Sequence, residues 1–164
     1  MSSPILDAAC VLLDTTGLPW QRLRHPPAID AAALAEARGL PITAGVKALV
    51  LKVRGDYVLL AVRAHERTDN RAVRRALAAQ KLRFARPEEL TALGLVRGQI
   101  PPIGRPLMPF DLIADPGVLE GEVVAFTAGS AVDSIVMATA DWRAVAAPRV
   151  APLVARPHQQ DPPK

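Results

Sequence analysis

The sequence predicts an α/β protein of the α+β type, with a mixed, partly barrel-like β-sheet core and helices packed outside it. Three observations lead to this prediction. Helical and strand-like segments alternate irregularly, neighbouring strand-like segments are joined by tight turns, and half of the residues are apolar. A doubly wound parallel sheet would show a regular alternation of strands and helices, so the mixed sheet is favoured.

The length of 164 residues is enough to bury a core within a single domain. We expect that domain to cover residues 1–155. The polar, proline-rich residues 156–164 predict a flexible C-terminal tail.

Two helices are expected within the first forty residues. Ser3 and Asp30 are of the residue types that cap helix N-termini, and a proline follows Ser3 in the first turn. Gly17 and Gly39 follow these two segments, as glycine does at helix C-termini. A short strand over 18–24 is expected between the helices, and a His-Pro-Pro sequence ends it.

The centre of the chain predicts a β-hairpin. Residues 46–53 and 57–62 are rich in β-branched and apolar residues and are joined across Arg54-Gly55-Asp56. The later elements follow from the same signals. They are a helix from Asp69 or Asn70 to about Ala79, a strand over 81–85, a helix over 87–93, strands over 109–114, 123–126 and 134–138, and a helix over 142–146 capped by Asp141.

Several classes of protein are excluded. There is one cysteine, Cys10, and the three histidines His25, His65 and His158 share no metal-ligand spacing, so no metal site is expected. Neither a Gly-x-Ser-x-Gly nucleophile motif nor a Walker or Rossmann phosphate motif is present. What remains is catalysis by positioning, from backbone amides, a lysine and a water molecule, without a cofactor.

The location is predicted to be cytoplasmic. No run of 18 apolar residues could span a membrane, and the N-terminus lacks the basic region of a secretion signal. A single cysteine fits a reducing compartment. The net charge of +4 and the pI of about 9.8 fit a polyanionic partner without demonstrating one.

Two features indicate a site for an anionic, ester-bearing ligand. The segment 94–104 holds three glycines and two prolines, which describes a stiff loop with an accessible backbone. Lys47 lies near the start of the most apolar strand-like run, where an ammonium group could hold a phosphate. A hydroxyl of Thr127 or Ser130, beside Gly129, could orient a water molecule.

Each feature also has a purely structural interpretation. Lys47 could be a surface lysine, the loop a rigid connector, and the late serine and threonine ordinary turn residues. Likewise Arg71, Arg74 and Arg75 form one basic helix face, which could contact a nucleic-acid backbone or simply be solvated. The residues alone leave these alternatives open.

The pattern resembles the YbaK/EbsC-type aminoacyl-tRNA deacylases, which are related to the editing domain inserted in bacterial prolyl-tRNA synthetases. The resemblance covers roughly residues 3–147. Gly45-Val-Lys47-Ala-Leu-Val-Leu51 is similar to the family's lysine strand, Gly98 to Pro102 to its Gly-x-x-x-Pro loop, and Phe126-Thr-Ala-Gly-Ser130 to its late small-residue turn.

The resemblance implies a free-standing trans-editing hydrolase that removes a wrong amino acid from the 3′ end of a tRNA. Water would attack the aminoacyl ester, assisted by the tRNA's own ribose hydroxyl, with no metal or cofactor. Lys47 would hold the terminal phosphate and the Gly98 backbone would position the ester. The substrate-binding set implied by the resemblance is Ala48, Pro102, Gly104, Thr127, Gly129 and Ser134.

Two departures from the family pattern keep an alternative open. Ala48 replaces a frequent hydroxyl residue after the lysine, and Ser134 stands where some members have an acid. The alternative is a non-catalytic tRNA- or synthetase-binding module on the same scaffold. An aminoacyl-tRNA synthetase is a possible partner in either case, whereas the absence of a helix-turn-helix pattern argues against DNA.

Overall fold

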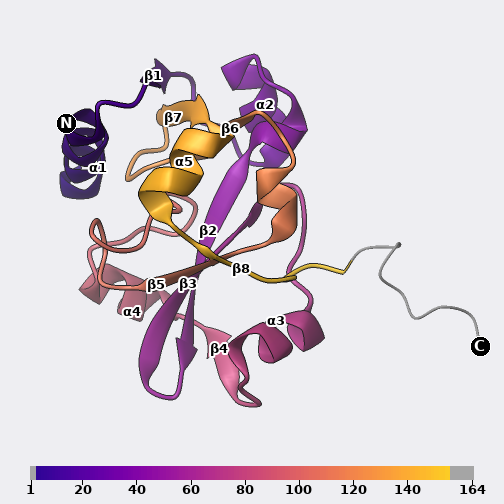
Figure 1. Ribbon diagram of the computed structural model, residues 1–164. Helices are drawn as coiled ribbons and strands as arrows, with labels where there is room; N and C mark the ends of the chain where they lie inside the picture. The colour runs from indigo at the N-terminus through magenta and orange to yellow at the C-terminus, as the bar shows by residue number, and fades with distance from the viewer. Residues whose placement is uncertain (1–2, 156–164) are drawn as a thin grey trace, which may run out of the picture.

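A computed structural model describes residues 3–155, whose strands form two sheets (Figure 1). The first sheet has the order β4, β2, β3, β5, β8, and the second has the order β1, β7, β6. Antiparallel pairs such as β2–β3 occur beside parallel pairs such as β3–β5. The strands are β1 Trp20–Arg24, β2 Val46–Val53, β3 Asp56–Arg63, β4 Leu82–Phe84, β5 Asp111–Ala114, β6 Val123–Thr127, β7 Asp133–Ala138 and β8 Arg149–Val150.

The two sheets meet at the start of β2. An isolated parallel bridge joins Gly45 to Ala125 of β6, so the strands curve from one sheet into the next. The described strands do not close into a barrel. The predicted mixed α/β class is confirmed.

The helices surround these sheets, and most begin at the expected caps. They are α1 Pro4–Thr16, α2 Ala31–Arg38, α3 Asn70–Leu77, α4 Pro87–Ala92 and α5 Thr139–Ala146, with 3-10 turns η1 Ile42–Ala44 and η2 Pro116–Leu119. The side chains of Ser3, Asp30 and Asp69 each accept a backbone N–H in the first turn of their helix. The first backbone N–H groups of a helix have no partner within the helix, and these side chains supply one. The sequence prediction of the caps was based on this effect.

The predicted hairpin exists, but its turn is shorter than expected. Arg54 has φ 52° and Gly55 has φ 85°, and Val53 pairs directly with Asp56. Positive φ at both central residues is the two-residue turn that matches the twist of paired strands. β3 therefore begins at Asp56 and not at Tyr57.

The predicted start of the last helix was wrong. α5 begins at Thr139 after Ala138, so Asp141 lies within the first turn and is not the cap. A carboxylate there still complements the positive end of the helix dipole. The 3-10 turns and β8 were not anticipated, because two- to four-residue elements carry too little periodicity to be recognised.

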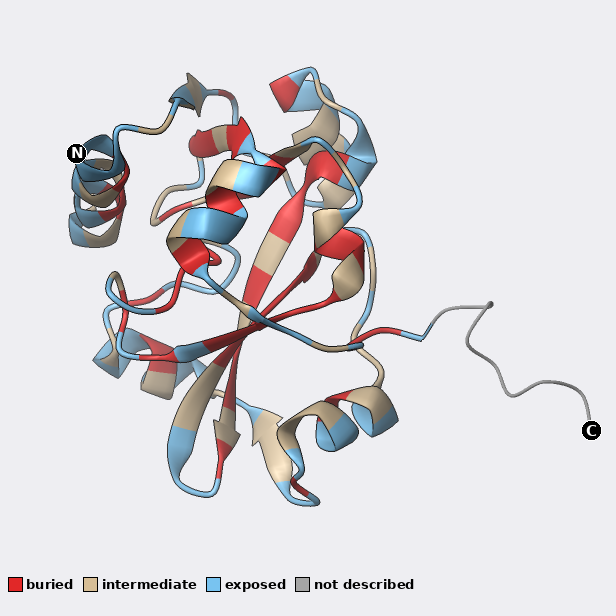
Figure 2. Ribbon diagram, viewed as in Figure 1, coloured by how far each residue is buried: buried red, intermediate tan, exposed pale blue. Residues whose placement is uncertain are grey.

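Two apolar clusters lie on opposite faces of the five-stranded sheet. Val46, Ala48 and Val50 of β2 belong to the main core, which the second sheet and α1 also enter. Leu51 and Val53 belong to a second cluster under α3 and the C-terminal segment. Figure 2 shows the buried positions following the crossing strands at the centre of the molecule. Because strand residues alternate between faces, Lys47 shares the face of the second cluster.

The predicted tail, residues 156–164, lies outside the described residues. The division into a domain over 1–155 and a tail therefore stays a prediction. Within residues 3–155, no helix has both the length and the apolar character needed to cross a bilayer.

Candidate functional site

Lys47 lies on a different face from the residues beside it in the chain. It pairs across the hairpin with Val62, which belongs to the second cluster, and directly paired residues share a face. Its side chain is half-buried, and burial lowers the pKa of its ammonium group. Nearby Arg67 lowers that pKa further, and Glu66 acts in the opposite direction.

Lys47 forms no ion pair with any residue in the described part of the chain. A partly desolvated ammonium group without a carboxylate partner is energetically costly in the free protein. An anionic ligand would supply the missing partner.

The Gly45–Ala125 bridge extends the Lys47 face onto the second sheet. Alternation places Lys47 on the side of Gly45 and Thr127 on the side of Ala125, and bridged residues share a side. Thr127 in turn pairs directly with Ser134 of β7. Lys47, Thr127 and Ser134 therefore project from the same side of the joined sheets, and we call this side the Lys47 face.

Thr127 connects the Lys47 face to the glycine-proline loop. Its Oγ1 donates to the Gly98 carbonyl oxygen at 2.7 Å, and the amide of Gly129 donates to the Gln99 carbonyl oxygen at 2.6 Å. Gly98 has φ 82° and its Cα faces open space. No acceptor among the described residues takes its amide hydrogen. The loop is thus fixed on one side while the Gly98 amide remains available to a ligand.

A buried polar group lies deeper on the same side. Arg38 of α2 donates through Nε to Ser134 Oγ at 2.9 Å and through NH1 to the Ala125 carbonyl at 3.4 Å. His25 Nε2 contacts the same Ser134 oxygen at 2.7 Å, and its Nδ1 lies 2.9 Å from the Pro26 carbonyl. Because a carbonyl can only accept, Nδ1 donates to it, and Nε2 is hydrogen-bonded to the Ser134 hydroxyl.

Arg38 adds a second cation that lacks a carboxylate partner among residues 3–155. Burial lowers the pKa of its guanidinium to about 10, which leaves it charged at neutral pH. A side chain built on Gly45 would meet Arg38 NH1 at 3.5 Å, so Arg38 lies on the side of Gly45 and Lys47. The Lys47 face therefore has a positive potential suited to an anion.

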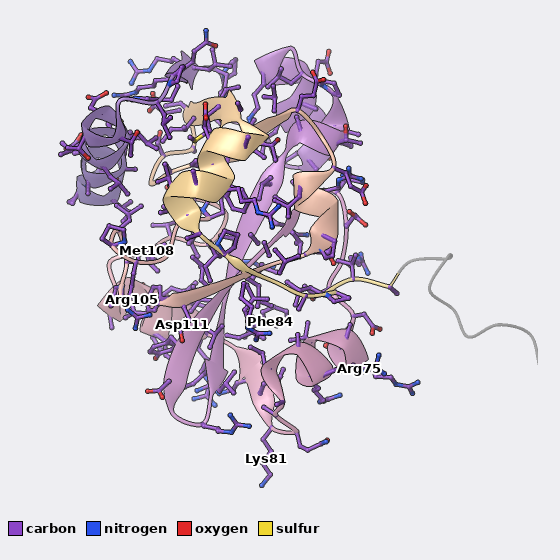
Figure 3. The ribbon with its side chains drawn as sticks, in the orientation of Figure 1. Arg75, Lys81, Phe84, Arg105, Met108 and Asp111 are labelled. Carbon is purple, nitrogen blue, oxygen red and sulfur yellow. The ribbon has the colours of Figure 1, made fainter. Side chains whose placement is uncertain are left out.

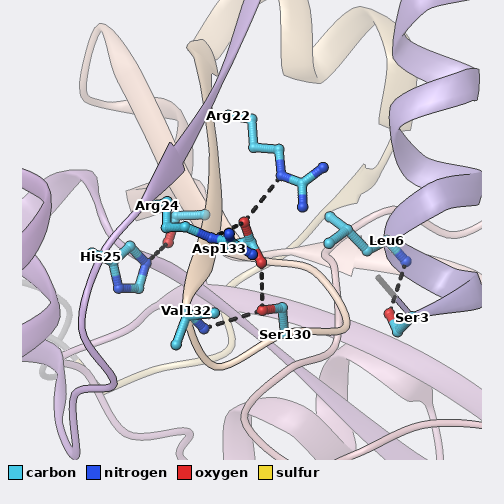
Figure 4. A network of polar contacts seen from close by, with 9 residues as sticks. Ser3, Leu6, Arg22, Arg24, His25, Ser130, Val132 and Asp133 are labelled. Carbon is cyan, nitrogen blue, oxygen red and sulfur yellow. Dashed lines mark hydrogen bonds and ion pairs between the residues drawn. The ribbon is translucent and has the colours of Figure 1, made fainter. Parts of the chain in front are cut away.

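The late turn after β6 is held from two directions (Figure 4). Ser130 Oγ donates to Asp133 at 2.7 Å and accepts the Val132 amide, while Arg22 Nε approaches Asp133 at 3.0 Å. Burial alone would raise the pKa of the Asp133 carboxyl, but the hydrogen bonds from Ser130 and Arg22 outweigh it and the net shift is downward. The Ser130 hydroxyl is therefore committed to the protein, whereas Thr127 Oγ1 can still accept a hydrogen bond.

Four of the predicted substrate-binding residues occupy structural positions. The side chain of Ala48 is buried in the main core, opposite Lys47. The Pro102 carbonyl accepts from Trp142 Nε1 at 3.0 Å. At Gly104 an added Cβ would collide with the Phe110 carbonyl, and at Gly129 it would collide with Ser3 and Ile5 of the α1 region. Ala48 thus belongs to the core, and Pro102, Gly104 and Gly129 have structural roles in the loop and the late turn.

Arg38 was not predicted from the sequence as a site residue, and His25 was considered as the end of a strand and as a metal ligand, not as a partner of Ser134. Arg38 ends an alanine-rich helix, where an arginine is expected to complement the helix dipole. Nothing local marks it as buried, because its partner Ser134 lies 96 positions away.

The surface hollows at the hairpin end and at α3 are not lined by Lys47, Gly98 or Thr127. One of about 520 Å³ lies at the hairpin end, between Gly55, Tyr57 and Phe110. Arg105 and Asp111 border it and form an ion pair (Figure 3). No cluster of three or more potential metal ligands occurs within residues 3–155.

The two sheets joined by the Gly45–Ala125 bridge, with helices around them, define a protein of the mixed α/β class. Comparison with known proteins identifies the group within that class. Residues 25–145 match the model of the aminoacyl-tRNA editing domain, and the chain belongs to that family, as its resemblance predicted.

Two relatives set this membership in context. The chain is 32% identical over 146 residues to a protein of Escherichia coli K12, the "Multifunctional Ser/Thr-tRNA deacylase ProXp-y", with 85% of this chain and 86% of that protein covered. A crystal structure of a candidate trans-editing enzyme for prolyl tRNA synthetase has a TM-score of 0.83 at 25% identity. That match covers 95% of this chain and 100% of the other.

Proposed function

We propose that this protein is a free-standing hydrolase that removes a wrongly attached amino acid from the 3′ end of a tRNA. Two observations carry the proposal. The half-buried Lys47 ammonium has no ion-pair partner among the described residues, and the exposed Gly98, whose amide has no acceptor there, is joined by Thr127 to the Lys47 face. Membership of the aminoacyl-tRNA editing family, and the name of the Escherichia coli relative as a tRNA deacylase, support hydrolysis of an aminoacyl ester.

In this mechanism each group has one task. Lys47 binds the phosphate of the terminal nucleotide through a charge-assisted contact. The Gly98 amide donates to an oxygen of the ester or the terminal ribose. Thr127 Oγ1, whose hydrogen is committed to Gly98, accepts a hydrogen from the attacking water or from a ribose hydroxyl.

The reaction balances without a nucleophilic side chain. Water oxygen bonds to the ester carbonyl carbon, the bond to the ribose oxygen breaks, and a proton passes to that oxygen with help from the neighbouring ribose hydroxyl. The products are the free amino acid and the uncharged tRNA. Positioning and electrostatic stabilisation supply the rate enhancement.

We propose that Ser134 and Arg38 close the acyl side of the site and that the protein acts in the cytoplasm. Ser- and Thr-tRNA are the first substrates to test, because the Escherichia coli relative is named for them. Association with an aminoacyl-tRNA synthetase would bring the editing step close to the source of errors.

The test is a panel of tRNAs, each charged with a different labelled amino acid and incubated with purified protein. We expect release of at least one amino acid by the unmodified protein and little release by Lys47→Met, which keeps the aliphatic stem. Pull-down with purified synthetases tests the partner. Hydrolysis of no member of the panel, with tRNA binding retained, would instead support the non-catalytic binding module.

A further inference from the structure

The helix α3 and the residues around it carry an unusual concentration of positive charge. Residues 70–87 contain six Lys or Arg residues and no Asp or Glu. Because the whole chain is only +4, removing these six charges leaves −2 for all other residues. The net positive charge of this protein therefore depends on this segment, although Arg83 is paired with Glu89.

The charged side chains of this surface point into solvent. Arg71, Arg74, Arg75 and Lys81 are all exposed, and Figure 3 shows Arg75 and Lys81 extending outward near α3 and β4. None of the four forms an ion pair within residues 3–155. Arg74 uses Nε to reach the Gln80 carbonyl at 3.1 Å, which holds the arginine in place while its terminal nitrogens stay accessible.

Helix stability explains only part of this charge. Arg74 and Arg75 lie in the last turn of α3, where cations complement the helix dipole, but Arg71 lies in the first turn, where a cation is unfavourable. The repulsion among these neighbouring cations also opposes folding. A binding partner with negative charge would account for all three arginines.

The surface is hollowed where these residues meet. One hollow of about 570 Å³ is lined by Arg71, Arg74 and Arg75, and an adjoining one of about 440 Å³ is lined by Arg74 and Lys81. The two hollows share Arg74 and Gln80. α3 has eight residues and is about 12 Å long, which corresponds to roughly three to four phosphates of a stacked strand.

The basic surface continues toward Lys47. Arg67, which is exposed, lies close enough to Lys47 to lower its pKa, and it precedes α3 in the chain. The buried residue of α3, Val73, packs in the second apolar cluster, on the side of the sheet from which Lys47 projects. One ligand could therefore contact Lys47 and α3 without passing around the edge of the sheet.

We propose that Arg67, Arg71, Arg74, Arg75 and Lys81, the α3 basic strip, bind the phosphate backbone of the tRNA acceptor stem. The strip directs the unpaired 3′ end toward Lys47. This inference rests on the proposed function, because it assigns a docking surface to the same substrate. An RNA backbone is favoured over a protein partner because every charged residue of the strip is a cation, and Phe84 is the only large apolar side chain that is exposed within residues 70–87.

The first experiment measures binding of uncharged full-length tRNA between 50 and 200 mM salt, and compares it with an oligonucleotide of the unpaired 3′ end alone. Each phosphate contact contributes about 0.9 to the slope of log K against log salt. We expect the Arg71→Gln, Arg74→Gln, Arg75→Gln triple variant to lower that slope by about two to three for full-length tRNA. We expect no change for the oligonucleotide.

A matched pair of single variants controls for loss of charge. Arg75→Gln and Arg143→Gln each remove an exposed arginine from the last turn of a helix, α3 and α5 respectively. We expect the slope to fall by about one for Arg75→Gln only. Thermal unfolding of both variants checks that the fold is kept.

The second experiment separates the strip from the reaction site. The triple variant should reduce kcat/KM on charged full-length tRNA by at least about tenfold and leave kcat/KM on the charged oligonucleotide unchanged. An unchanged salt slope in a folded triple variant, or equal losses on both substrates, would overturn the strip. So would loss of synthetase binding with tRNA binding intact.

The outcomes also separate the two proposals. If the unmodified protein binds tRNA through the strip but hydrolyses no charged tRNA, the proposed function fails and the strip stands. If it hydrolyses charged tRNA with the same kcat/KM in the triple variant, the strip fails and the proposed function stands.

Discussion

Lys47 and Lys52 lie five residues apart on β2 and have opposite surroundings. Lys52 contacts Glu89 Oε2 at 3.4 Å and lies 5.4 Å from the centroid of the Tyr57 ring, whereas Lys47 forms no ion pair with a described residue. An odd separation along a strand places them on opposite faces of the sheet. The comparison teaches that one strand can carry a cation held by a carboxylate and a cation without an ion pair among the described residues, and it is the second that we propose binds the ligand.

Glu89 organises the structural end of the strand. It accepts from Tyr57 OH at 2.6 Å and from Arg83 NH1 at 2.6 Å, in addition to its contact with Lys52. The hydrogen bonds from Arg83 and then Tyr57 hold the pKa of the Glu89 carboxyl well below its usual range. At the Lys47 end, Glu66 is close enough to act on the pKa of Lys47 but forms no ion pair with it, so within the described residues the ammonium group is not held by a carboxylate.

The largest expected effect on activity is that of replacing Lys47 by alanine, with the same replacement of Lys52 as the control. Lys47→Ala should lower kcat/KM on charged tRNA by about 10- to 150-fold, because a charge-assisted hydrogen bond contributes about 1.5–3 kcal/mol. Its Tm should stay close to that of the unmodified protein, since no ion pair is lost. Lys52→Ala is the control, and it should lower Tm slightly with kcat/KM unchanged. Equal activity losses in both variants would break the comparison.

The next effect concerns the buried polar group of the Lys47 face. Ser134→Ala leaves Arg38 Nε and His25 Nε2 without their shared partner. Leaving buried polar groups unsatisfied should lower the free energy of unfolding by about 1–3 kcal/mol. Urea denaturation measures this change. A loss below 0.5 kcal/mol, within roughly the range of surface substitutions, would mean that solvent reaches these groups.

A smaller effect is expected where the loop joins the second sheet. Thr127→Val removes the hydrogen bond to the Gly98 carbonyl, which contributes about 0.5–1.5 kcal/mol. We expect a fall in kcat of about 2- to 10-fold, because Gly98 is then held less firmly and the acceptor for water is lost. Thr127→Ser keeps the hydroxyl and should restore the rate. If both variants behave alike, the hydroxyl has no role.

The smallest effect is expected at Glu89, which organises the structural end of β2, and it depends on pH. Because the folded-state pKa of Glu89 is lowered, its stabilising contribution is present above the unfolded pKa of about 4.3 and is lost as pH falls further. Glu89→Gln should therefore lower Tm at pH 7, and the difference from the unmodified protein should shrink below about pH 4. Thermal unfolding from pH 7 to pH 3 checks this, and a difference that grows on acidification would contradict it.

Local sequence signals were sufficient for much of the fold. Ser3 and Asp30 cap their helices as predicted, and Asp69 is the one of the two predicted candidates that caps α3, because a side-chain oxygen satisfies amides only three residues away. The hairpin was found from its apolar runs and its glycine, although the exact turn depended on the φ angle of Arg54. Asp141 was wrongly predicted as a cap because aspartate is typical both of the N-cap position and of the first helical turn.

The sequence by itself determined where the longer strands and helices form, and it singled out Lys47 and the Gly98 loop. Tertiary structure alone decided that Lys47 and Thr127 project from one side, through a bridge between Gly45 and Ala125. It also buried Arg38 against Ser134. The physical reason is range: caps and alternation act over a few residues, whereas sharing a face or a buried partner depends on contacts between segments 80 or more positions apart.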